Sequence, residues 1–279
     1  MGATLDTVLH IVRNVRTGRN RVLSRRESIG APIFIVGCGH SGTTLVLAML
    51  SAHRRIFSVP YETQFIVLSA AEIQKFVSEF DENTISAGKY RWVEKSPVHI
   101  YNIDSLLTYF GDARIILMLR DGRDVAVSFR DRTGDIDAGV RRWIDNNRAG
   151  EPFWRHQAVL VVRYEELIAA PGATLQSICT FLGESFDPAM LRHHESDFRF
   201  LGHVAHAQQF RGQIHAMTEK PRSASGSNHR LYRSWQAKQP LFDGRGRWKG
   251  ALSAKERSLL KDLAGPTLIR YGYASDLEW

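Results

Sequence analysis

A glycine-rich segment with three hydroxyl side chains follows an apolar run near the start of the chain. Residues 37–44 read Gly-Cys-Gly-His-Ser-Gly-Thr-Thr and come directly after the apolar run 32–36. A turn between a buried strand and a helix aims successive backbone N–H groups and the positive helix end at one spot. Glycine lets the backbone approach an anion closely, and the hydroxyl groups add donors. The segment therefore predicts a site for phosphate or sulfate, although a tight turn that binds no ligand can also have this composition.

The spacing of Gly37 and Gly42 matches the phosphate loop of nucleoside triphosphatases, but the two residues that follow do not. Those enzymes have lysine followed by serine or threonine, whereas this chain has Thr43 and Thr44. Without the lysine, the γ-phosphate of ATP lacks its usual charge partner. The segment therefore favours the transfer of a less highly charged group without magnesium, and it disfavours a kinase.

A second anion site is predicted where another apolar run ends in an arginine. Residues 115–119 lead into Arg120, and Ser128 follows eight positions later on an expected helix. The guanidinium fork suits a phosphate, and a serine hydroxyl adds a donor. Arg132, one turn beyond Ser128, adds positive charge. The alternative is that Arg120 pairs with an aspartate at the start of the helix.

The alternation of apolar runs with amphipathic segments indicates how these residues are positioned. The expected strands are residues 32–36, 56–59, 92–95, 114–119 and 159–163, with helices between most of them. This pattern predicts an α/β fold with a mostly parallel sheet flanked by helices, similar to that of the phosphate-loop nucleotide hydrolases. Both predicted anion sites then lie at the ends of neighbouring parallel strands.

Local signals define two helices in the second half of the chain. Pro171 opens one helix and Gly183 closes it, and a capping box at 253–256 starts another that is expected to end near Ala264. Residues 197–246 have no regular pattern, which is typical of a functional lid or a mobile segment.

Positive charge is concentrated at the start of the chain. The formal net charge is +8, and residues 1–29 hold six arginines against two acidic residues, a local charge of +4. Apolar residues at helical spacing accompany these arginines, so this arm is either a basic amphipathic helix on an anionic membrane or a helix packed on the domain. The length of 279 residues favours one domain, which we expect over residues 30–279.

The composition indicates in which cellular compartment the protein is expected and whether it is expected to bind a metal. The proportions of 43% hydrophobic and 24% charged residues are those of a soluble globular protein. Two cysteines, Cys38 and Cys179, are too few for a disulfide framework or a zinc site. The sequence has neither an apolar run long enough to cross a membrane nor a signal-peptide pattern. We therefore expect a cytoplasmic protein that binds no metal.

The two anion motifs together resemble those of sulfotransferases that depend on 3′-phosphoadenosine-5′-phosphosulfate (PAPS), nearest in motifs to the bacterial and protein-tyrosine types. That family binds the 5′-phosphosulfate with a strand-loop-helix of the form R-S-G-T-T, which Ser41 to Thr44 match. At position 40 the chain has His40 where the family usually has arginine or lysine. A histidine can still donate a hydrogen bond, but its charge depends on pH. The resemblance implies that the 5′-phosphosulfate is bound by Gly39, His40, Ser41, Gly42, Thr43 and Thr44.

The same resemblance implies the residues at the other end of the nucleotide. In the family, the strand-end arginine and the serine eight positions later bind the 3′-phosphate, which gives this role to Arg120 and Ser128, with Arg132 nearby. A tyrosine that lies by the nucleotide corresponds to Tyr164. A basic loop before the last helix closes over the nucleotide, and its cations in this chain are Arg245, Arg247 and Lys249.

Two further segments resemble family segments that carry catalysis. Residues 60–63 resemble the segment that holds the base in protein-tyrosine sulfotransferases, which implies that Glu62 deprotonates the acceptor hydroxyl. Residues 93–97 resemble a segment whose lysine faces the bridging oxygen of the leaving phosphate, which implies that Lys95 offsets the charge that develops there. Each can instead be an ordinary surface residue at a strand end.

The resemblance extends from about Pro32 to Tyr273, with the motifs in the family's order. It implies an enzyme that transfers a sulfuryl group from PAPS, its co-substrate, to a hydroxyl acceptor without a metal. Glu62, Lys95 and His40 are its implied catalytic residues. The alternatives are a phosphate-loop kinase and a non-enzymatic protein that binds nucleic acid or membrane.

The partners are less sharply defined than the reaction. A glycan, a lipid, a tyrosine or a small metabolite can all be the acceptor, because we expect variable loops at 64–90, 133–156 and 197–243 to build its pocket. We expect no nucleic-acid partner, and membrane contact only at the periphery, through residues 1–29. Nothing in the sequence indicates the oligomeric state.

Overall fold

The five predicted strands form one parallel sheet in the computed structural model, which describes residues 29–203 and 228–279. The strand order is β2-β4-β1-β5-β6, and every neighbouring pair is parallel. The strands are β1 (Ile33–Gly37), β2 (Ile56–Ser58), β4 (Arg91–Lys95), β5 (Arg114–Leu119) and β6 (Val159–Arg163). The prediction of an α/β fold with a parallel sheet is confirmed.

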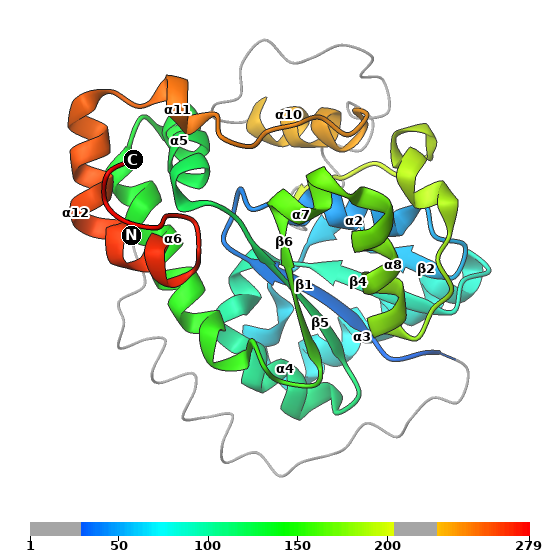
Figure 1. Ribbon diagram of the computed structural model, residues 1–279. Coiled ribbons are helices and arrows are strands. Elements are labelled where there is room, and N and C mark those ends of the chain that lie inside the picture. Colours follow the sequence, from blue (N-terminus) through cyan, green and yellow to red (C-terminus); the bar gives the residue numbers. More distant parts are fainter. Residues whose placement is uncertain (1–28, 204–227) are drawn as a thin grey trace.

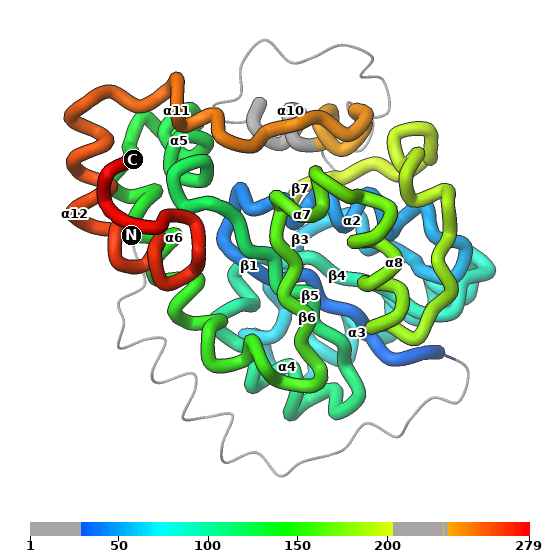
Figure 2. Tube along the Cα trace, viewed as in Figure 1, coloured from blue at the N-terminus to red at the C-terminus, as the bar shows by residue number. Residues whose placement is uncertain are grey.

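Helices connect the strands and cover the sheet (Figure 1). The α-helices of the described residues are α2 (Thr43–Ser51), α3 (Ala70–Ser86), α4 (Ile103–Phe110), α5 (Gly122–Thr133), α6 (Ile136–Gly150), α7 (Tyr164–Ala169), α8 (Pro171–Leu182), α10 (Asn228–Ala237), α11 (Trp248–Ala251) and α12 (Ala254–Arg270). The 3₁₀ helices in the same ranges are η1 (Phe65–Val67), η2 (Pro97–Asn102), η3 (Glu151–Phe153) and η4 (Pro188–Glu195). A separate two-stranded sheet pairs β3 (Tyr61–Glu62) with β7 (Gly202–His203), as Figure 2 shows.

The strands are apolar because both faces of the sheet are buried. In β1, Ile33 and Ile35 pack in the cluster that contains α2 and α8, whereas Phe34 and Val36 pack in the cluster that contains α3 and α4. This alternation is the period of two that a strand imposes on its side chains. A third cluster, around the fully buried Trp143, joins α5, α6, α11 and α12.

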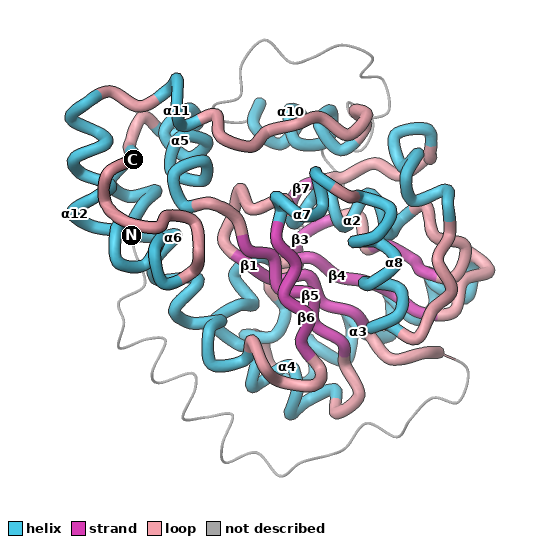
Figure 3. Tube along the Cα trace, in the orientation of Figure 1, coloured by secondary structure: helices cyan, strands magenta, loops and turns pink. Residues whose placement is uncertain are grey.

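The order of the strands reverses at β1, because the chain places β2 and β4 on one side of it and β5 and β6 on the other (Figure 3). In open parallel sheets, ligands bind outside the carboxyl ends of the strands at such a reversal. The loops that follow β1 and β5 leave the sheet at this point, and they carry both predicted anion sites.

Three expectations about helices need correction. The predicted end of the last helix near Ala264 is wrong, since α12 continues through Pro266 to Arg270. Proline removes one N–H group there, but Leu260 and Leu268 on either side of it are fully buried, so packing maintains the helix. Residues 64–90 and 133–156, expected as variable loops, consist mainly of α3 with η1 and of α6 with η3.

Some expectations fall on segments that the structure does not describe. The basic arm lies outside the described residues except for Ile29, and so do residues 204–227, about half of the irregular segment. The domain boundary at residue 30 therefore stays a prediction. In the described part of the irregular segment, residues Asn228–Ala237 form α10, so the expectation of an irregular loop is wrong there. Within the described ranges, none of the helices has the length and the apolar character needed to cross a bilayer.

Candidate active site

The loop after β1 needs glycine at two positions. Gly37 and Gly42 have φ angles of 146° and 92°, in the region that favours glycine. A Cβ atom on Gly37 would lie 2.6 Å from the carbonyl oxygen of Met118, and one on Gly42 would lie 2.8 Å from the ring of Tyr164. His40 is also left-handed, with a φ of 73°. The segment 37–44, called the glycine loop below, is thus held close to β5 and α7.

The glycine loop holds three hydroxyl groups that the rest of the structure leaves without a hydrogen bond. The side-chain oxygens of Ser41, Thr43 and Thr44 are buried, and none of the described residues provides them with a partner. Buried polar groups are nearly always hydrogen-bonded in folded proteins. Since α2 begins at Thr43, its positive end is at the same place. This donor set fits the oxygens of a bound phosphate or sulfate.

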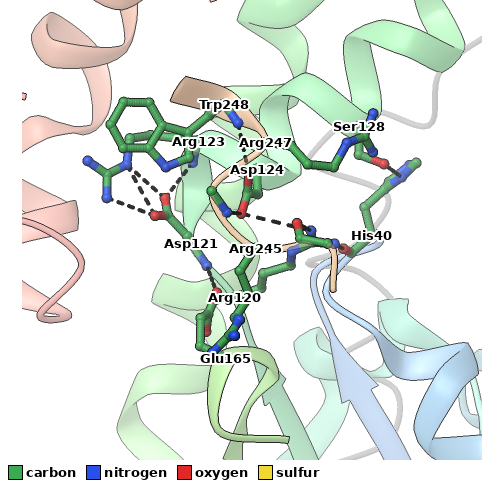
Figure 4. A network of polar contacts seen from close by, with 12 residues as sticks. His40, Arg120, Asp121, Arg123, Asp124, Ser128, Glu165, Arg245, Arg247 and Trp248 are labelled. Atoms are coloured by element: carbon green, nitrogen blue, oxygen red, sulfur yellow. Dashed lines mark hydrogen bonds and ion pairs between the residues drawn. The ribbon is translucent and has the colours of Figure 1, made fainter. Parts of the chain in front are cut away.

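Arg120, at the end of β5, reaches the glycine loop directly. Its Nη1 atom donates to the carbonyl oxygen of His40 at 3.0 Å, and its Nη2 atom donates to the carbonyl oxygen of Gly244 at 2.6 Å. The guanidinium lies 4.1 Å from the centroid of the Tyr164 ring. Ser128 Oγ, two turns along α5, is hydrogen-bonded to His40 Nδ1 at 2.8 Å (Figure 4). The two predicted anion sites therefore meet.

The alternative role for Arg120, a salt bridge to one of the next two aspartates, is only partly realised. Asp121 pairs with Arg123 at 2.7 Å instead. Asp124 Oδ2 lies 3.9 Å from Arg120 Nη2, at the limit of an ion pair. One nitrogen of Arg120, Nε, is buried and has no hydrogen-bond partner among the described residues. The guanidinium thus retains a donor for a ligand.

Asp124 is a residue of this site that sequence reasoning missed. Its carboxylate accepts hydrogen bonds from the backbone N–H groups of Gly246 at 2.8 Å and Trp248 at 3.0 Å (Figure 4). Burial raises the pKa of the Asp124 carboxyl, and these bonds and Arg120 only partly offset that effect. The sequence shows only that Asp124 is an acidic residue in the first turn of an expected helix, and this pattern indicates a helix start rather than a binding site. We use the name arginine site for Arg120, Asp124, Ser128, Tyr164 and Gly244.

A cavity of about 200 Å³ opens where the glycine loop and the arginine site meet. Leu241 and Phe242, which follow α10, form part of its wall. Eight of the residues that the sequence singled out line it, namely His40, Gly42, Thr44, Arg120, Ser128, Arg132, Tyr164 and Arg247. One cavity therefore receives side chains from both predicted anion sites.

The three cations of the basic loop differ in their surroundings. Arg247 lines the cavity and lies 3.3 Å from Asp131. Arg245 pairs with Asp243 through two nitrogens, and this pairing lowers the pKa of Asp243 to about 2. Lys249, in α11, is not among the residues that line the cavity. The geometry thus favours Arg247 as the cation that faces a ligand.

Basic side chains surround Phe129 next to the glycine loop. The ring centroid of Phe129 lies 5.9 Å from that of His40, 5.0 Å from the guanidinium of Arg132 and 5.8 Å from that of Arg142. Arg142 also approaches the loop itself, since its Nη2 atom is 3.6 Å from the position of a Cβ atom on Gly39. Two arginines, Arg132 and Arg142, therefore supply positive charge near position 40, and no sequence pattern identified Arg142.

Glu62 and Lys95 contact each other, although they come from different strands. Glu62 is in β3, Lys95 ends β4, and the two side chains form an ion pair. The Lys95 side chain is fully buried, with its ammonium group 4.1 Å from the centroid of the Phe200 ring. Lys95 is paired in register with Ile35 of β1, two residues before the glycine loop begins. The structure therefore brings these two residues together, but neither of them lines the cavity.

Comparison with known proteins agrees with this geometry. The model of the sulfotransferase family matches residues 32–88 and 70–188, more than half of the chain. Among curated proteins, protein-tyrosine sulfotransferase 1 of Danio rerio is 28% identical over 224 residues, which are 65% of this chain and 61% of that one. A putative protein-tyrosine sulfotransferase of Caenorhabditis briggsae is 26% identical over 58% of this chain and 69% of its own length. An uncharacterised protein of Aquifex aeolicus is 24% identical over 63% of this chain, which corresponds to only 28% of its own length.

Solved structures show the same fold at low sequence identity. The sulfotransferase domain of the Synechococcus PCC 7002 olefin synthase has a TM-score of 0.54 and 19% identity, with 88% of this chain and 98% of that one covered. Mouse sulfotransferase SULT7A1, solved in complex with PAP, has a TM-score of 0.53 and 16% identity, with 89% of each chain covered. With its sheet, its glycine loop and the match of the family model over residues 32–188, the chain belongs to the sulfotransferase family.

Proposed function

We propose that the protein transfers a sulfuryl group from PAPS to a hydroxyl acceptor. One observation carries the proposal: Arg120 donates to the backbone of His40 while Ser128 bonds to its ring, so two anion sites open into one cavity. A molecule with phosphate groups at both ends of one nucleoside matches two such sites. PAPS has this form, with a 3′-phosphate on one side of its adenosine and a 5′-phosphosulfate on the other.

The residues present fit PAPS. The buried hydroxyls of Ser41, Thr43 and Thr44 supply donors for the 5′ end. Arg120, Ser128 and Arg247 supply donors for the 3′-phosphate, where an arginine fork is well suited. Tyr164, Leu241 and Phe242 line the same cavity and offer apolar surface to the nucleoside. PAPS supplies the sulfuryl group, and adenosine 3′,5′-bisphosphate is the product.

The ion pair of Glu62 and Lys95 supplies the two remaining chemical roles. The carboxylate of Glu62 takes the proton of the attacking hydroxyl, which makes the oxygen a better nucleophile. The ammonium of Lys95 offsets the negative charge that develops on the leaving phosphate. Because the two groups form an ion pair, the proposed base and the proposed cation are held next to each other. Arg142 adds positive charge near the glycine loop.

A tyrosine phenol is the acceptor that this arrangement supports best. A glutamate is a weak base, with an ordinary pKa of about 4.3, and a phenol, with a pKa of about 10, releases its proton more readily than an aliphatic alcohol does. Two of the three curated relatives described above are named as protein-tyrosine sulfotransferases, one of them putatively. Because the chain spans between 28% and 69% of the length of the curated relatives reported above, their substrates do not transfer to it directly.

Two measurements test the proposal. In a thermal-shift assay, adenosine 3′,5′-bisphosphate should raise the melting temperature without magnesium, and at 100 times its Kd it should add about 2.7 kcal/mol of stability. A preference for Mg·ATP would indicate a kinase, and a preference for an oligonucleotide or anionic vesicles would indicate a binding protein. Transfer of ³⁵S from labelled PAPS to tyrosyl peptides, glycans, lipids and small hydroxyl compounds then identifies the acceptor, and a lack of transfer to peptides would remove the phenol.

We also propose that the protein is cytoplasmic, since its two cysteines fit a reducing compartment. The six arginines of residues 1–29 suit peripheral contact with an anionic membrane. Removal of residues 1–29 should abolish co-sedimentation with vesicles that contain anionic lipid, whereas an unchanged bound fraction would remove the membrane role of the arm.

A further inference from the structure

A buried polar cluster lies behind the ion pair of Glu62 and Lys95. It consists of Thr63, Glu94, Ser96 and His99, which are all between 0% and 5% exposed, and we call it the Glu94 cluster. The sequence analysis did not single out any of these residues for a role. None of them lines the cavity of the proposed nucleotide site. Burial of a carboxylate costs free energy, so a buried glutamate outside the cavity is expected to have a structural role.

The carboxylate of Glu94 gathers several hydrogen bonds on one oxygen. Glu94 Oε1 accepts from the backbone N–H of Thr63 at 3.1 Å, from the hydroxyl of Thr63 at 2.9 Å and from the hydroxyl of Ser96 at 2.6 Å. Ser96 Oγ in turn accepts from the backbone N–H groups of Thr63 at 3.1 Å and Gln64 at 3.0 Å. Two residues of the β4 end therefore hold the backbone that directly follows Glu62.

The other oxygen of Glu94 faces a histidine. His99 Nδ1, in η2, lies 3.3 Å from Glu94 Oε2. Burial by itself raises the pKa of the Glu94 carboxyl, but His99 and the hydrogen bonds from Ser96 and Thr63 outweigh it and hold the pKa below its usual value. The bonds from Thr63 and Ser96 favour the ionised form of Glu94, and hydrogen bonds to an ionised carboxylate are stronger than those between neutral groups.

Strand geometry links this cluster to the ion pair. Side chains alternate between the two faces of a strand, so neighbours such as Glu94 and Lys95 point in opposite directions. Glu62 contacts Lys95, and Thr63, the residue that directly follows β3, contacts Glu94. The ion pair between residues 62 and 95 and the hydrogen bonds between residues 63 and 94 thus lie back to back. The chain then turns sharply at Gln64, whose φ of 53° is left-handed.

We propose that Glu94, through Thr63 and Ser96, is a positioning residue that fixes the carboxylate of Glu62 against Lys95. This inference rests on the proposed function, in which Glu62 is the base. Because β3 has only two residues, its paired strand β7 constrains it little. The Glu94 cluster supplies the constraint that a longer sheet would otherwise give. Loss of the cluster should therefore lower kcat and leave nucleotide binding intact.

Thr63→Val tests the proposal, with Thr63→Ser as the matched control. Valine keeps the shape of threonine but removes the hydroxyl that donates to Glu94, whereas serine keeps it. We expect kcat to fall on the order of 10-fold in Thr63→Val, because a small misplacement of a catalytic group lowers the rate steeply. Thr63→Ser should stay within about twofold of the unchanged protein, and the affinity for adenosine 3′,5′-bisphosphate should be the same in all three. If Thr63→Val does not fold, Ser96→Ala takes its place.

A double-mutant cycle with Glu62→Gln separates positioning from general destabilisation. If the Glu94 cluster acts through Glu62, Thr63→Val should lower kcat in the unchanged protein but not in the Glu62→Gln background. Equal losses in both backgrounds would overturn the proposal, and so would an unchanged kcat.

A crystal structure of Thr63→Val gives a result that does not depend on activity. The proposal expects Glu62 to move away from Lys95, and an unchanged ion pair would overturn it even if the protein transfers no sulfuryl group. The absence of transfer by the unchanged protein would instead count against the proposed function.

Discussion

The glycine loop and the arginine site face the same cavity, but their polar groups are satisfied differently. In the glycine loop, the hydroxyls of Ser41, Thr43 and Thr44 have no hydrogen-bond partner among the described residues. In the arginine site, Arg120 donates to two backbone carbonyls and stacks on Tyr164. Asp124 accepts from two backbone N–H groups of the C-terminal loop. The hydroxyl groups of the glycine loop thus lack hydrogen-bond partners, whereas Arg120 and Asp124 in the arginine site already bond to the protein's own backbone.

This difference separates binding from stability. A buried hydroxyl without a partner costs about 1–3 kcal/mol in the free protein, which a ligand recovers on binding. The guanidinium of Arg120 bonds to two distant backbone segments and so stabilises the free protein, while its Nε donor remains for a ligand. Substitutions in the glycine loop should therefore weaken binding without loss of stability, whereas substitutions in the arginine site should lower both.

The largest effect is expected from Arg120→Ala. The affinity for adenosine 3′,5′-bisphosphate should fall about 100-fold, because hydrogen bonds to charged groups contribute about 1.5–3 kcal/mol each. The free protein should also lose about 2–3 kcal/mol of stability, since the carbonyls of His40 and Gly244 lose their donor. Isothermal titration calorimetry and urea unfolding measure the two quantities.

Arg120→Lys is the control for charge. It keeps the positive charge but cannot bridge both carbonyls, so it should recover part of the affinity and little of the stability. If Arg120→Ala weakened binding without any change in stability, the contrast between the two sites would be wrong.

Thr44→Val should weaken bisphosphate binding about 10-fold, because one hydrogen bond to a charged ligand is lost. The free protein should be as stable as before, or more stable by up to about 1 kcal/mol, because the substitution removes a buried hydroxyl that has no partner. Ser128→Ala is the matched hydroxyl deletion in the arginine site, where the side chain does have a partner in His40. A loss of stability in Thr44→Val as large as that in Ser128→Ala would contradict the distinction.

Sequence patterns predicted those features of the two sites that depend on residues close together in the chain. The strands β1 and β5 are buried on both faces, so their sequences are continuous apolar runs and are easy to recognise. The glycine loop and Arg120 were identifiable because each directly follows such a run. The cap of α3 was also readable, since Ser69 and Glu72 form a capping box, yet residues 64–90 were expected to be a variable loop.

Contacts between distant segments could not be predicted in this way. Asp124 binds residues more than 120 positions away, and Thr63, just after the short strand β3, binds Glu94 of β4. An aspartate in a first helical turn and a glutamate in a strand have many ordinary explanations. Only the packing of elements that are distant in the chain brings these pairs together, and no local pattern encodes that packing.

Asp124→Asn should change the affinity for adenosine 3′,5′-bisphosphate less than Thr44→Val does, and whether the affinity rises or falls is informative. Loss of a negative charge near a phosphate should by itself strengthen binding, whereas loss of one of the two bonds that hold Gly246 and Trp248 should weaken it. We expect weakening of about fivefold, because an asparagine has only one accepting oxygen for two N–H groups. A gain in affinity, measured at 0.1 M and 0.5 M salt, would show that Asp124 acts through its charge and not through the loop.

The smallest effects are expected in the basic loop, where Arg245 and Arg247 form a matched pair two residues apart. Arg247 lines the cavity, so Arg247→Ala should weaken bisphosphate binding about threefold in low salt and less in high salt, as a half-exposed charge does. Arg245 is held by Asp243, and Arg245→Ala should leave the affinity unchanged. Both variants remove one positive charge from the same loop. If these arginines acted only through long-range electrostatic attraction, the two variants would lose the same affinity. Unequal losses would show that position relative to the cavity, and not net charge, selects the cation that binds the ligand.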